Sequence, residues 1–388
     1  MVSLLAILIF SIPLALSSSS SVEPDTVLST SFFVLLLVFS CLWVVIKGVS
    51  WQKLRPIKHP LFFFAFSLAF AMIFLIGQSG DLWEIVKYAL GFILFILIAP
   101  LSESDKERIA SIIVGTAFFI SLLALYQYFF GFQVLLNYVK ETKITDPFVL
   151  EKIAAQRVFF PFPTPAILGG YLAMILPLTL TPQKRVVCFL TMSFALLLTK
   201  SLGALLSLAI VFTAFLLIQT HFRRKKALAL LTLVIILGSI FALRAGSSGE
   251  SLLPSFSLAS RLHYWKETWK IICAHPWTGV GFGRFALRES SYAHNFFLQL
   301  WAEAGLASIV SFLWLITATL KHSLGASCRP LGAGFAAGVF IFLIHNLMDF
   351  SLFLPAVSFI GWIMLGLLYF PGSQPLEKDQ PGFSPEEV

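Results

Sequence analysis

The chain has 388 residues, of which 58% are apolar and only 12% are charged, and 41 of them are phenylalanine. A water-soluble core cannot enclose so much apolar surface, so the composition excludes an ordinary soluble protein and predicts an all-α polytopic membrane protein. The net charge of +8 comes from short cationic clusters between apolar runs. Membrane topology requires that pattern, which therefore does not indicate nucleic-acid binding.

The apolar runs predict about twelve transmembrane helices in a single integral membrane domain, residues 1–370. Most of them approach the ~20 residues that a helix needs to cross a bilayer. The first run, from Val2 to Leu16, lacks the cationic flank of a signal peptide, which favours an uncleaved helix over a cleaved leader. The expected spans are 2–16, 28–47, 60–78, 83–100, 109–131, 166–182, 186–199, 202–220, 227–243, 295–320, 331–349 and 355–370.

Lysine and arginine clusters orient the expected spans, because cations beside a span tend to remain in the cytoplasm. All the clusters fall on one side of the alternating spans, at residues 47–58, 106–108, 184–185, 223–226 and 321–329. Both termini are therefore predicted to be cytoplasmic. The loops 132–165 and 244–294 are predicted to be external, and the tail 371–388, rich in Pro, Gly and acidic residues, to be disordered.

The four cysteines are scattered along the chain, with no pair at the spacing of metal ligands. Those in or beside apolar runs are expected to behave as small hydrophobic residues. The cysteines therefore predict no disulfide framework and no zinc site, and no cofactor is expected. The cysteines are Cys41, Cys188, Cys273 and Cys328.

The end of the first external loop presents a cation at the membrane face. Arg157 precedes Pro161, Pro163 and Pro165, and these prolines prevent a helix and hold the chain extended above the next span. One interpretation is an interfacial arginine that reaches the lipid headgroups. The other is a planar fork of donors for a phosphate oxygen.

The second external loop is predicted to contain an amphipathic helix over residues 258–273, lying in the membrane interface. Its apolar stripe places tryptophans at the depth of the headgroups, and its cations fall off that stripe. The glycine-rich turn 275–283 that follows lacks the spacing and the βαβ context of a dinucleotide site. The stripe is Leu262, Trp265, Trp269 and Ile272, and the cations are Arg261, Lys266 and Lys270.

Further polar residues are expected at the same external face. His294 and Asn295 stand at the mouth of a span, where a solvated or capping role is the alternative to catalysis. His345 and Asp349 lie four residues apart on one helix face, where they are either a pair that locks the helices or part of a site. Lys200 occupies the break between two short spans.

These residues resemble the bacterial O-antigen ligase and O-antigen polymerase superfamily of membrane glycosyltransferases. The pattern that carries the resemblance covers about 100 residues, and its order, spacing and external placement agree. More loosely, the resemblance includes Arg157 with its proline-rich segment and Gly169 upstream. The matching residues are Arg261, Trp265, His275-Pro276-Trp277-Thr278-Gly279-Val280-Gly281, Phe285, His294-Asn295, Leu298-Gln299, Glu303-Ala304-Gly305-Leu306, His345, Asp349 and Pro355.

The resemblance implies a GT-C-like fold in the bacterial inner membrane. It also implies transfer of a glycan from an undecaprenyl pyrophosphate carrier to an acceptor hydroxyl on the periplasmic face, without a metal or a nucleotide sugar. By the same resemblance, His294 engages or activates the acceptor, and Arg157 and Arg261 bind the pyrophosphate. Lys200, Asn295, His345 and Asp349 are supporting candidates. The chain departs from the family pattern Ser-Arg-Gly, because it has Ser201-Leu202-Gly203 with Lys200 as the nearest cation.

The residues leave the acceptor open: a lipid A core sugar, another lipid-linked glycan, a protein side chain or a wall polymer. The modest loop sizes favour ligase-type transfer over the polymerase reaction. A transporter of lipid-linked polysaccharide is an alternative from another class, but it predicts ionisable residues near the bilayer midplane and a two-fold repeat. A non-catalytic scaffold for envelope assembly is a further alternative, and it would tolerate the loss of His294.

Overall fold

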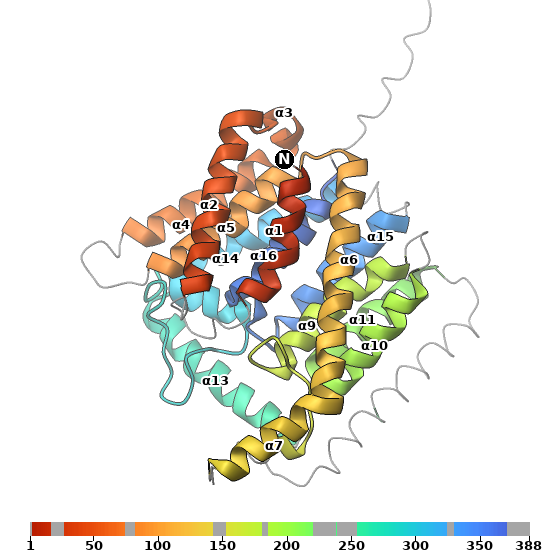
Figure 1. Ribbon diagram of the computed structural model, residues 1–388. Coiled ribbons are helices and arrows are strands. Elements are labelled where there is room, and N and C mark those ends of the chain that lie inside the picture. The colour runs from red at the N-terminus through yellow and green to blue at the C-terminus, as the bar shows by residue number, and fades with distance from the viewer. Residues whose placement is uncertain are drawn as a thin grey trace, which may run out of the picture.

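The apolar runs fold into helices that pack side by side in one bundle (Figure 1). The structure is a computed structural model that describes residues 2–16, 27–73, 82–142, 153–180, 185–219, 238, 254–323 and 330–370, and these contain no strand. Its α-helices are α1 (Val2–Ala15), α2 (Val27–Lys47), α3 (Trp51–Leu54), α4 (Lys58–Ile73), α5 (Leu82–Ile98), α6 (Glu103–Tyr126), α7 (Phe132–Glu141), α9 (Pro165–Ile175), α10 (Val186–Thr199), α11 (Leu202–Gln219), α13 (Pro254–Ala274), α14 (Phe296–Ser323), α15 (Pro330–His345) and α16 (Pro355–Leu368).

Helices overlap every expected span except 227–243, which lies outside the described residues apart from Gly238. By length and composition, two described helical segments are able to cross a membrane alone, Glu103–Glu141 and Phe296–Ser323. Counting α2 with the segment from α3 to α4 as one span adds a third, although a bend of 108° separates them. The other apolar helices have 10–17 residues, so the expected number of twelve spans stays a prediction.

The first external loop differs from the prediction, because it begins as a helix. Helix α6 continues through one π-helical turn, Gln127–Gly131, directly into α7. Gly131 does not end the helix, because its φ of −66° is helical. The side chain of Gln127 turns inward instead, and its Oε1 accepts the amides of Phe159 and Phe160 at 2.8 and 2.9 Å. The long helix is thereby fastened to the proline-rich segment.

Helix α9 lies in the interior of the bundle, where α6, α10, α11 and α15 surround it. It begins at Pro165, which the helix tolerates because the first turn needs no amide donor there. Thr164 caps it, since its Oγ1 accepts the amide of Ile167 at 3.4 Å. The helix ends in a short 3-10 turn, Leu176–Leu180. The expected span 166–182 is thus a short, enclosed helix.

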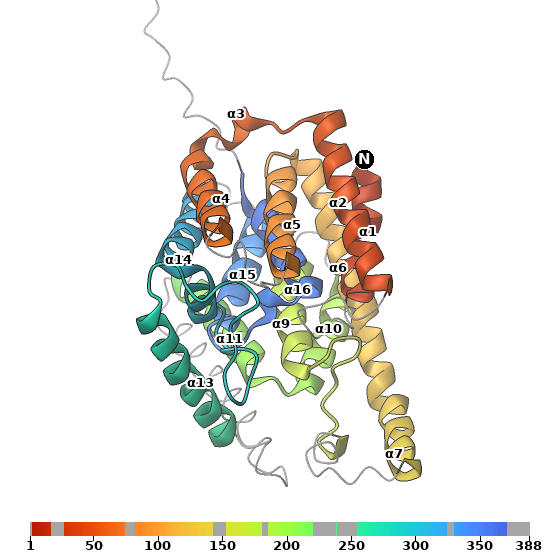
Figure 2. The same cartoon turned by 90° about the vertical axis from the view of Figure 1, so that its left-hand side faces the viewer.

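The two ends of the bundle carry different elements. Figure 2 shows α3 at one end and α7 and α13 at the other. The basic segment around α3 meets the end of α16 there, since Tyr369 donates its hydroxyl to the carbonyl of Lys53 at 2.8 Å. Large apolar side chains on the helices face outward, such as Val45 and Ile218, which are both 81% exposed. Such an exterior suits lipid contact.

Helix α13 confirms the predicted helix in the second loop, but not its predicted orientation. Trp265 and Ile272 of the predicted stripe face the protein, whereas Leu262 and Trp269 are about half exposed, at 52% and 50%. Arg261 was expected off the apolar stripe and instead lies on the partly buried side. The reason is that α13 packs on α14 and reaches the turn after α15, where the carbonyl of Met348 accepts a hydrogen bond from Arg261.

The glycine-rich turn after α13 supplies hydrogen-bond partners to backbone groups at a break in α14. Helix α14 is interrupted at Gly305, which has a φ of 77°, so backbone groups around it lose their helical partners. The amide of Gly281 donates to the carbonyl of Glu303 at 2.9 Å, and the amide of Leu306 donates to the carbonyl of Pro276 at 3.0 Å. A Cβ at residue 305 would lie 1.9 Å from a carbonyl oxygen of the turn, so only glycine fits.

Candidate functional site

His294 occupies a tight turn between the second loop and α14. Its φ is 51°, the left-handed conformation that residues other than glycine rarely adopt. Asn295 follows and caps α14, because its Oδ1 accepts the amides of Phe297 and Leu298 at 3.0 and 3.1 Å. The structure therefore gives the Asn295 side chain a capping role, and the imidazole of its neighbour projects from the start of the helix.

Aromatic rings enclose the imidazole of His294. The ring of Tyr264 on α13 stacks on it, with centroids 5.5 Å apart, and Phe350 meets it edge-on at 4.8 Å. Its side chain makes no hydrogen bond with any residue that the structure describes. The rings thus fix the plane of the imidazole and leave its nitrogens available for another molecule.

The turn after α15 supplies a buried carboxylate. Asp349 is 2% exposed, and its Oδ2 lies 2.8 Å from Nε2 of His345 and accepts the hydroxyl of Ser351 at 2.9 Å. The predicted pair of His345 and Asp349 is therefore confirmed as a contact. The same turn reaches α14, because the amide of Phe296 donates to the carbonyl of Asn346 at 3.0 Å. The start of α14 and the end of α15 are joined.

Arg261 ties α13 to this turn. Its Nε donates to the carbonyl of Met348 at 2.8 Å, and its Nη1 donates to both the carbonyl and the hydroxyl of Ser257. Its Nη2 donates to none of the described residues. Arg261, Asp349 and His294 are near enough to influence one another electrostatically. These three residues, from three separate segments, are brought together as the sequence predicts.

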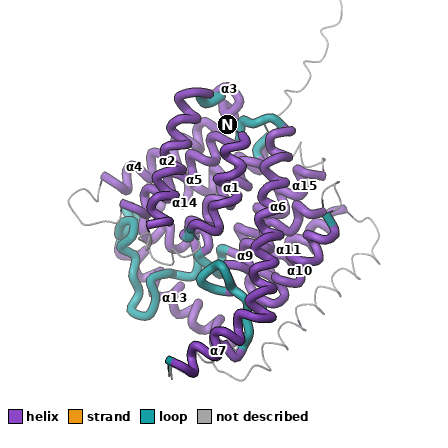
Figure 3. Tube along the Cα trace, viewed as in Figure 1, coloured by secondary structure: helices purple, strands orange, loops and turns teal. Residues whose placement is uncertain are grey.

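The other two predicted cations form a separate cluster. Arg157 donates from Nε to the carbonyl of Thr199 at 3.0 Å, and Lys200 donates from Nζ to the carbonyl of Ala155 at 3.0 Å. The amide of Val158 adds a bond to the carbonyl of Leu198 at 3.2 Å, so the proline-rich segment is bound to the break between α10 and α11. Figure 3 shows the loop segments 155–164 and 275–295 at the same end of the helices as α13.

The ring of His345 connects the two groups of residues. It lies between α9 and α11: a Cβ at Gly170 would be 2.4 Å from its Cδ2 and Nε2, and one at Gly203 would be 3.4 Å from its Nδ1. A neighbouring glycine, Gly169, packs on Ser201 beside Lys200. The Thr199–Gly203 break and the buried pair are therefore parts of one continuous region, whereas no direct contact joins Arg157 to His294 among the described contacts.

Burial and charge set the protonation of this region. Burial lowers the pKa of His294 from its ordinary value of 6.5, Asp349 opposes that effect, and Arg261 adds to it. The carboxylate of Asp349 is held by its hydrogen bonds with His345 and Ser351 and lies close to His294. At pH 7 the site therefore holds a neutral imidazole between a carboxylate and a guanidinium.

Several residues of this region were not predicted as site residues. Tyr264 and Phe350 line the imidazole, although ring contacts between distant segments leave no local signal in the sequence. Gln299 and Glu303 are both 2% exposed and hydrogen-bonded at 2.9 Å. In the sequence they belong to the family pattern, which assigns them no role. A stronger signal was present, because an ionisable residue inside an apolar span is a candidate for function.

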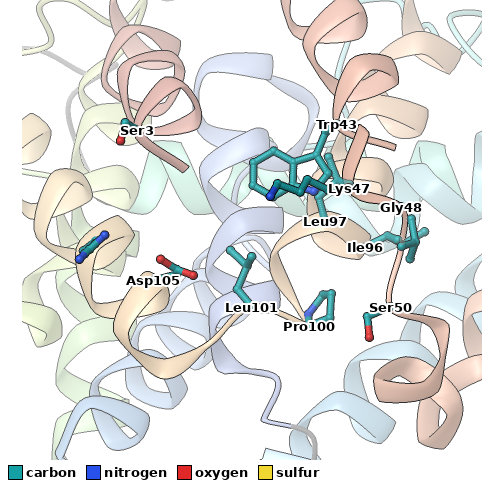
Figure 4. A pocket seen from close by; sticks show the side chains of 12 residues that line it. Ser3, Trp43, Lys47, Gly48, Ser50, Ile96, Leu97, Pro100, Leu101 and Asp105 are labelled. Carbon is teal, nitrogen blue, oxygen red and sulfur yellow. The ribbon is translucent and has the colours of Figure 1, made fainter. Parts of the chain in front are cut away.

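The rest of the described chain offers fewer alternatives. No group of three His, Cys, Asp or Glu side chains there could hold a metal ion. A pocket of about 490 Å³ opens near α3, at the end of the bundle opposite α13 (Figure 4). Lys47, Arg108 and Asp105 line it together with apolar residues, and it contains no residue of the region around His294.

The comparisons with known proteins agree with the resemblance. Residues 187–313 match a family model described as O-antigen ligase. The matched segment contains Lys200, Arg261, His294 and Asn295, whereas Arg157 and the pair of His345 and Asp349 lie outside it. A comparison with curated proteins found no match.

Proposed function

The chain belongs to the O-antigen ligase and polymerase superfamily, and from that premise we propose that it transfers a glycan from an undecaprenyl pyrophosphate carrier to an acceptor hydroxyl. The observation that carries the proposal is the imidazole of His294, which is neutral, enclosed and without a hydrogen bond to the described residues. A general base needs those properties, because it has to accept a proton from the substrate at neutral pH.

In the proposed step, the hydroxyl oxygen of the acceptor attacks the anomeric carbon of the donor sugar. The hydroxyl proton passes to the unprotonated nitrogen of His294 as the new C–O bond forms. The bond between the anomeric carbon and the pyrophosphate oxygen breaks, and its electron pair leaves with the carrier pyrophosphate. Negative charge therefore grows on the leaving group, and positive charge grows on the imidazole.

Fixed charges of the site would stabilise both of these developing charges. Arg261, whose Nη2 donates to no described residue, would bind an oxygen of the pyrophosphate, and Arg157 would bind another. Lys200 would act there as a point charge in place of the arginine of the family pattern Ser-Arg-Gly. Asp349 would stabilise the imidazolium of His294, since its charge already favours the protonated form.

The acceptor distinguishes a ligase from a polymerase of this superfamily. A sugar of the lipid A core would make the protein a lipopolysaccharide ligase, and a second lipid-linked glycan would make it a polymerase. The α13 end of the bundle would then face the periplasm, and both termini would be cytoplasmic. His294 belongs to the loop segment 275–295, which lies at that end of the helices (Figure 3), and the acceptor would approach from there.

The test is incubation of the purified protein with a lipid-pyrophosphate glycan and each acceptor in turn. Release of the free carrier only with the lipid A core would establish the ligase, and release with the lipid-linked donor alone would establish the polymerase. The matched control is His294→Asn, which suits a left-handed backbone. No release with any acceptor would favour the transporter or the scaffold, and movement of the glycan across vesicles would separate those two.

A further inference from the structure

The first turns of α14 bury a polar pair inside an apolar helix. Gln299 and Glu303 lie one turn apart, and each is 2% exposed. Buried ionisable groups in membrane helices are costly and need a partner, so their presence calls for a reason. Glu303 lies two residues before the helix break at Gly305, and its main-chain carbonyl accepts the amide of Gly281.

The hydrogen bonds of this pair have a direction. Nε2 of Gln299 donates to Oε1 of Glu303 at 2.9 Å, and Oε1 of Gln299 accepts the amide of Ala293 at 3.0 Å. A carboxylate only accepts, so it fixes which end of the Gln299 amide faces it. With the amide reversed, an N–H group would face the N–H of Ala293. Glu303 therefore determines that Gln299 holds the residue before His294.

The position of His294 depends on this backbone contact. Its imidazole has no hydrogen bond to a described residue, so the turn and the rings of Tyr264 and Phe350 determine where it lies. The left-handed φ at residue 294 is intrinsically unfavourable for histidine, so contacts on both sides have to maintain it. Gln299 acts on the preceding residue, and the cap by Asn295 acts on the following helix.

We infer that Gln299 and Glu303 are positioning residues, which hold the turn at residues 293–295 so that the imidazole of His294 meets the acceptor hydroxyl. This inference rests on the proposed function. Neither side chain takes part in the chemistry. Their role is the orientation of a base whose side chain makes no hydrogen bond with the described residues, and small displacements of such a group reduce turnover strongly.

The first experiment replaces the amide. In Gln299→Leu an apolar side chain of comparable size replaces the polar one, so the backbone amide of Ala293 loses its acceptor. Turnover is expected to fall by ~10-fold to 10²-fold, as for a catalytic group displaced by about 1 Å. Donor affinity is expected to change less than about twofold, because Arg157 and Arg261 are held by other contacts. The matched control is Ser308→Ala, which changes a buried residue of the same helix and is expected to leave turnover unchanged.

The second experiment exchanges the pair. Gln299→Glu places two carboxylates side by side, and turnover is expected to fall about as far as in Gln299→Leu. Adding Glu303→Gln to Gln299→Glu restores one amide and one carboxylate, and the hydrogen bond between the two side chains then runs in the opposite direction. Glu at 299 then accepts both from Gln at 303 and from Ala293, so turnover is expected to return to within about threefold of the native value.

Two results would overturn the inference. One is native turnover per folded molecule in Gln299→Leu, and the other is a double variant no more active than Gln299→Glu. A role in stability alone would lower the melting temperature of Gln299→Leu without this rescue of turnover. Full activity of His294→Asn would instead refute the proposed base and this inference with it. If that variant is inactive and the Gln299 variants are active, only the inference fails.

Discussion

Both ends of the bundle bury charged side chains, but they use them differently. Near α3, Lys106 is 0% exposed, donates to the carbonyls of Gly366 and Tyr369, and lies 4.7 Å from the ring centre of Phe370. Lys53 donates to the carbonyl of Pro100 at 2.9 Å. These ammonium groups satisfy carbonyls at helix ends, which have no helical partners and carry partial negative charge.

At the α13 end ionisable groups from separate segments lie close enough to influence one another electrostatically. His345 meets Asp349, Arg261 binds the turn that contains this carboxylate, and His294 keeps its nitrogens unbonded among the described residues. Lys106 is more deeply buried than His294, yet its hydrogen bonds are already made by the protein. Burial of a charge is therefore a poor indicator of a site, whereas unused donors and acceptors beside fixed charges are a better one.

The two ends are expected to differ most in their accessibility to an impermeant thiol reagent, because one end should be labelled in intact cells and the other should not. A chain whose sole cysteine is Cys273, which is exposed on α13, is expected to react with an impermeant maleimide in intact cells. A chain whose sole cysteine replaces Ser104, which is exposed near α3, is expected to react only after lysis. The opposite pattern would reverse the predicted topology and move the site to the cytoplasm.

The base gives the next largest effect. His294→Asn is expected to lower turnover by ~10²-fold to 10⁴-fold, because the loss removes a general base from the transition state. Asparagine tolerates the left-handed backbone at this position, so insertion and donor binding are expected to survive. Single-turnover assays and binding of the lipid-linked donor separate these quantities. Turnover near the native level, at matched expression, would leave His294 as a helix-mouth residue.

The arginines are expected to act on the donor. Arg157→Ala and Arg261→Ala should each weaken donor binding by ~10-fold to 10²-fold, the loss of a charge-assisted hydrogen bond. Lysine at either position should restore only part of the affinity, because it lacks the planar fork of donors. Titration of each variant with the lipid-linked donor measures this. If only one alanine variant binds weakly, the other arginine is an interfacial anchor.

The acid limb of the pH profile tests the electrostatics of the site. A base works only when neutral, so activity is expected to persist as pH falls below 6.5 and to be lost at the lowered pKa of His294. Arg261→Gln removes a charge that lowers this pKa, and the acid limb should move to higher pH. Asp349→Asn removes a charge that raises it, and the limb should move to lower pH. Shifts in the opposite directions would refute the arrangement.

Lys106 at the other end should give the smallest effect on turnover. Lys106→Met keeps the length of the side chain but leaves two carbonyls without a donor, at a cost of about 1–3 kcal/mol in stability. Turnover per folded molecule is expected to stay unchanged. Thermal unfolding and single-turnover kinetics on the same preparation measure the two effects. A large fall in the turnover of Lys106→Met would show that the α3 end is coupled to the site, and it would contradict the proposed difference between the two ends.

Apolar run length predicted where the helices lie, because a long apolar run has few alternatives to a helix in a bilayer. It did not predict how they end. Helix α6 continues past Gly131 because Gln127 finds partners in the proline-rich segment, and α14 breaks at Gly305 because the turn after α13 supplies replacement bonds. Both outcomes depend on residues far away in the sequence. For the same reason, the inward side of α13 could not be predicted from the periodicity of its own residues.

The candidate site was predictable in its ionisable residues and not in its enclosure. Spacing placed His345 against Asp349, and the resemblance grouped Arg261 with His294. The ring of Phe350 that meets the imidazole and the bond from Ala293 to Gln299 arise only when separate segments meet. A sequence records which groups are able to react, whereas the fold determines which of them remain without a protein partner.

Gly170 and Gly203, the two glycines beside His345, restrict which residues are expected at these positions in related sequences. A methyl group at Gly170 would overlap the imidazole at 2.4 Å, so residue 170 cannot grow while His345 keeps its place. Loss of the imidazole would leave a void that a larger residue at 170 or 203 could fill. Across an alignment of homologues, these three positions are expected to covary in volume, with alanine or serine at 170 appearing where 345 is small.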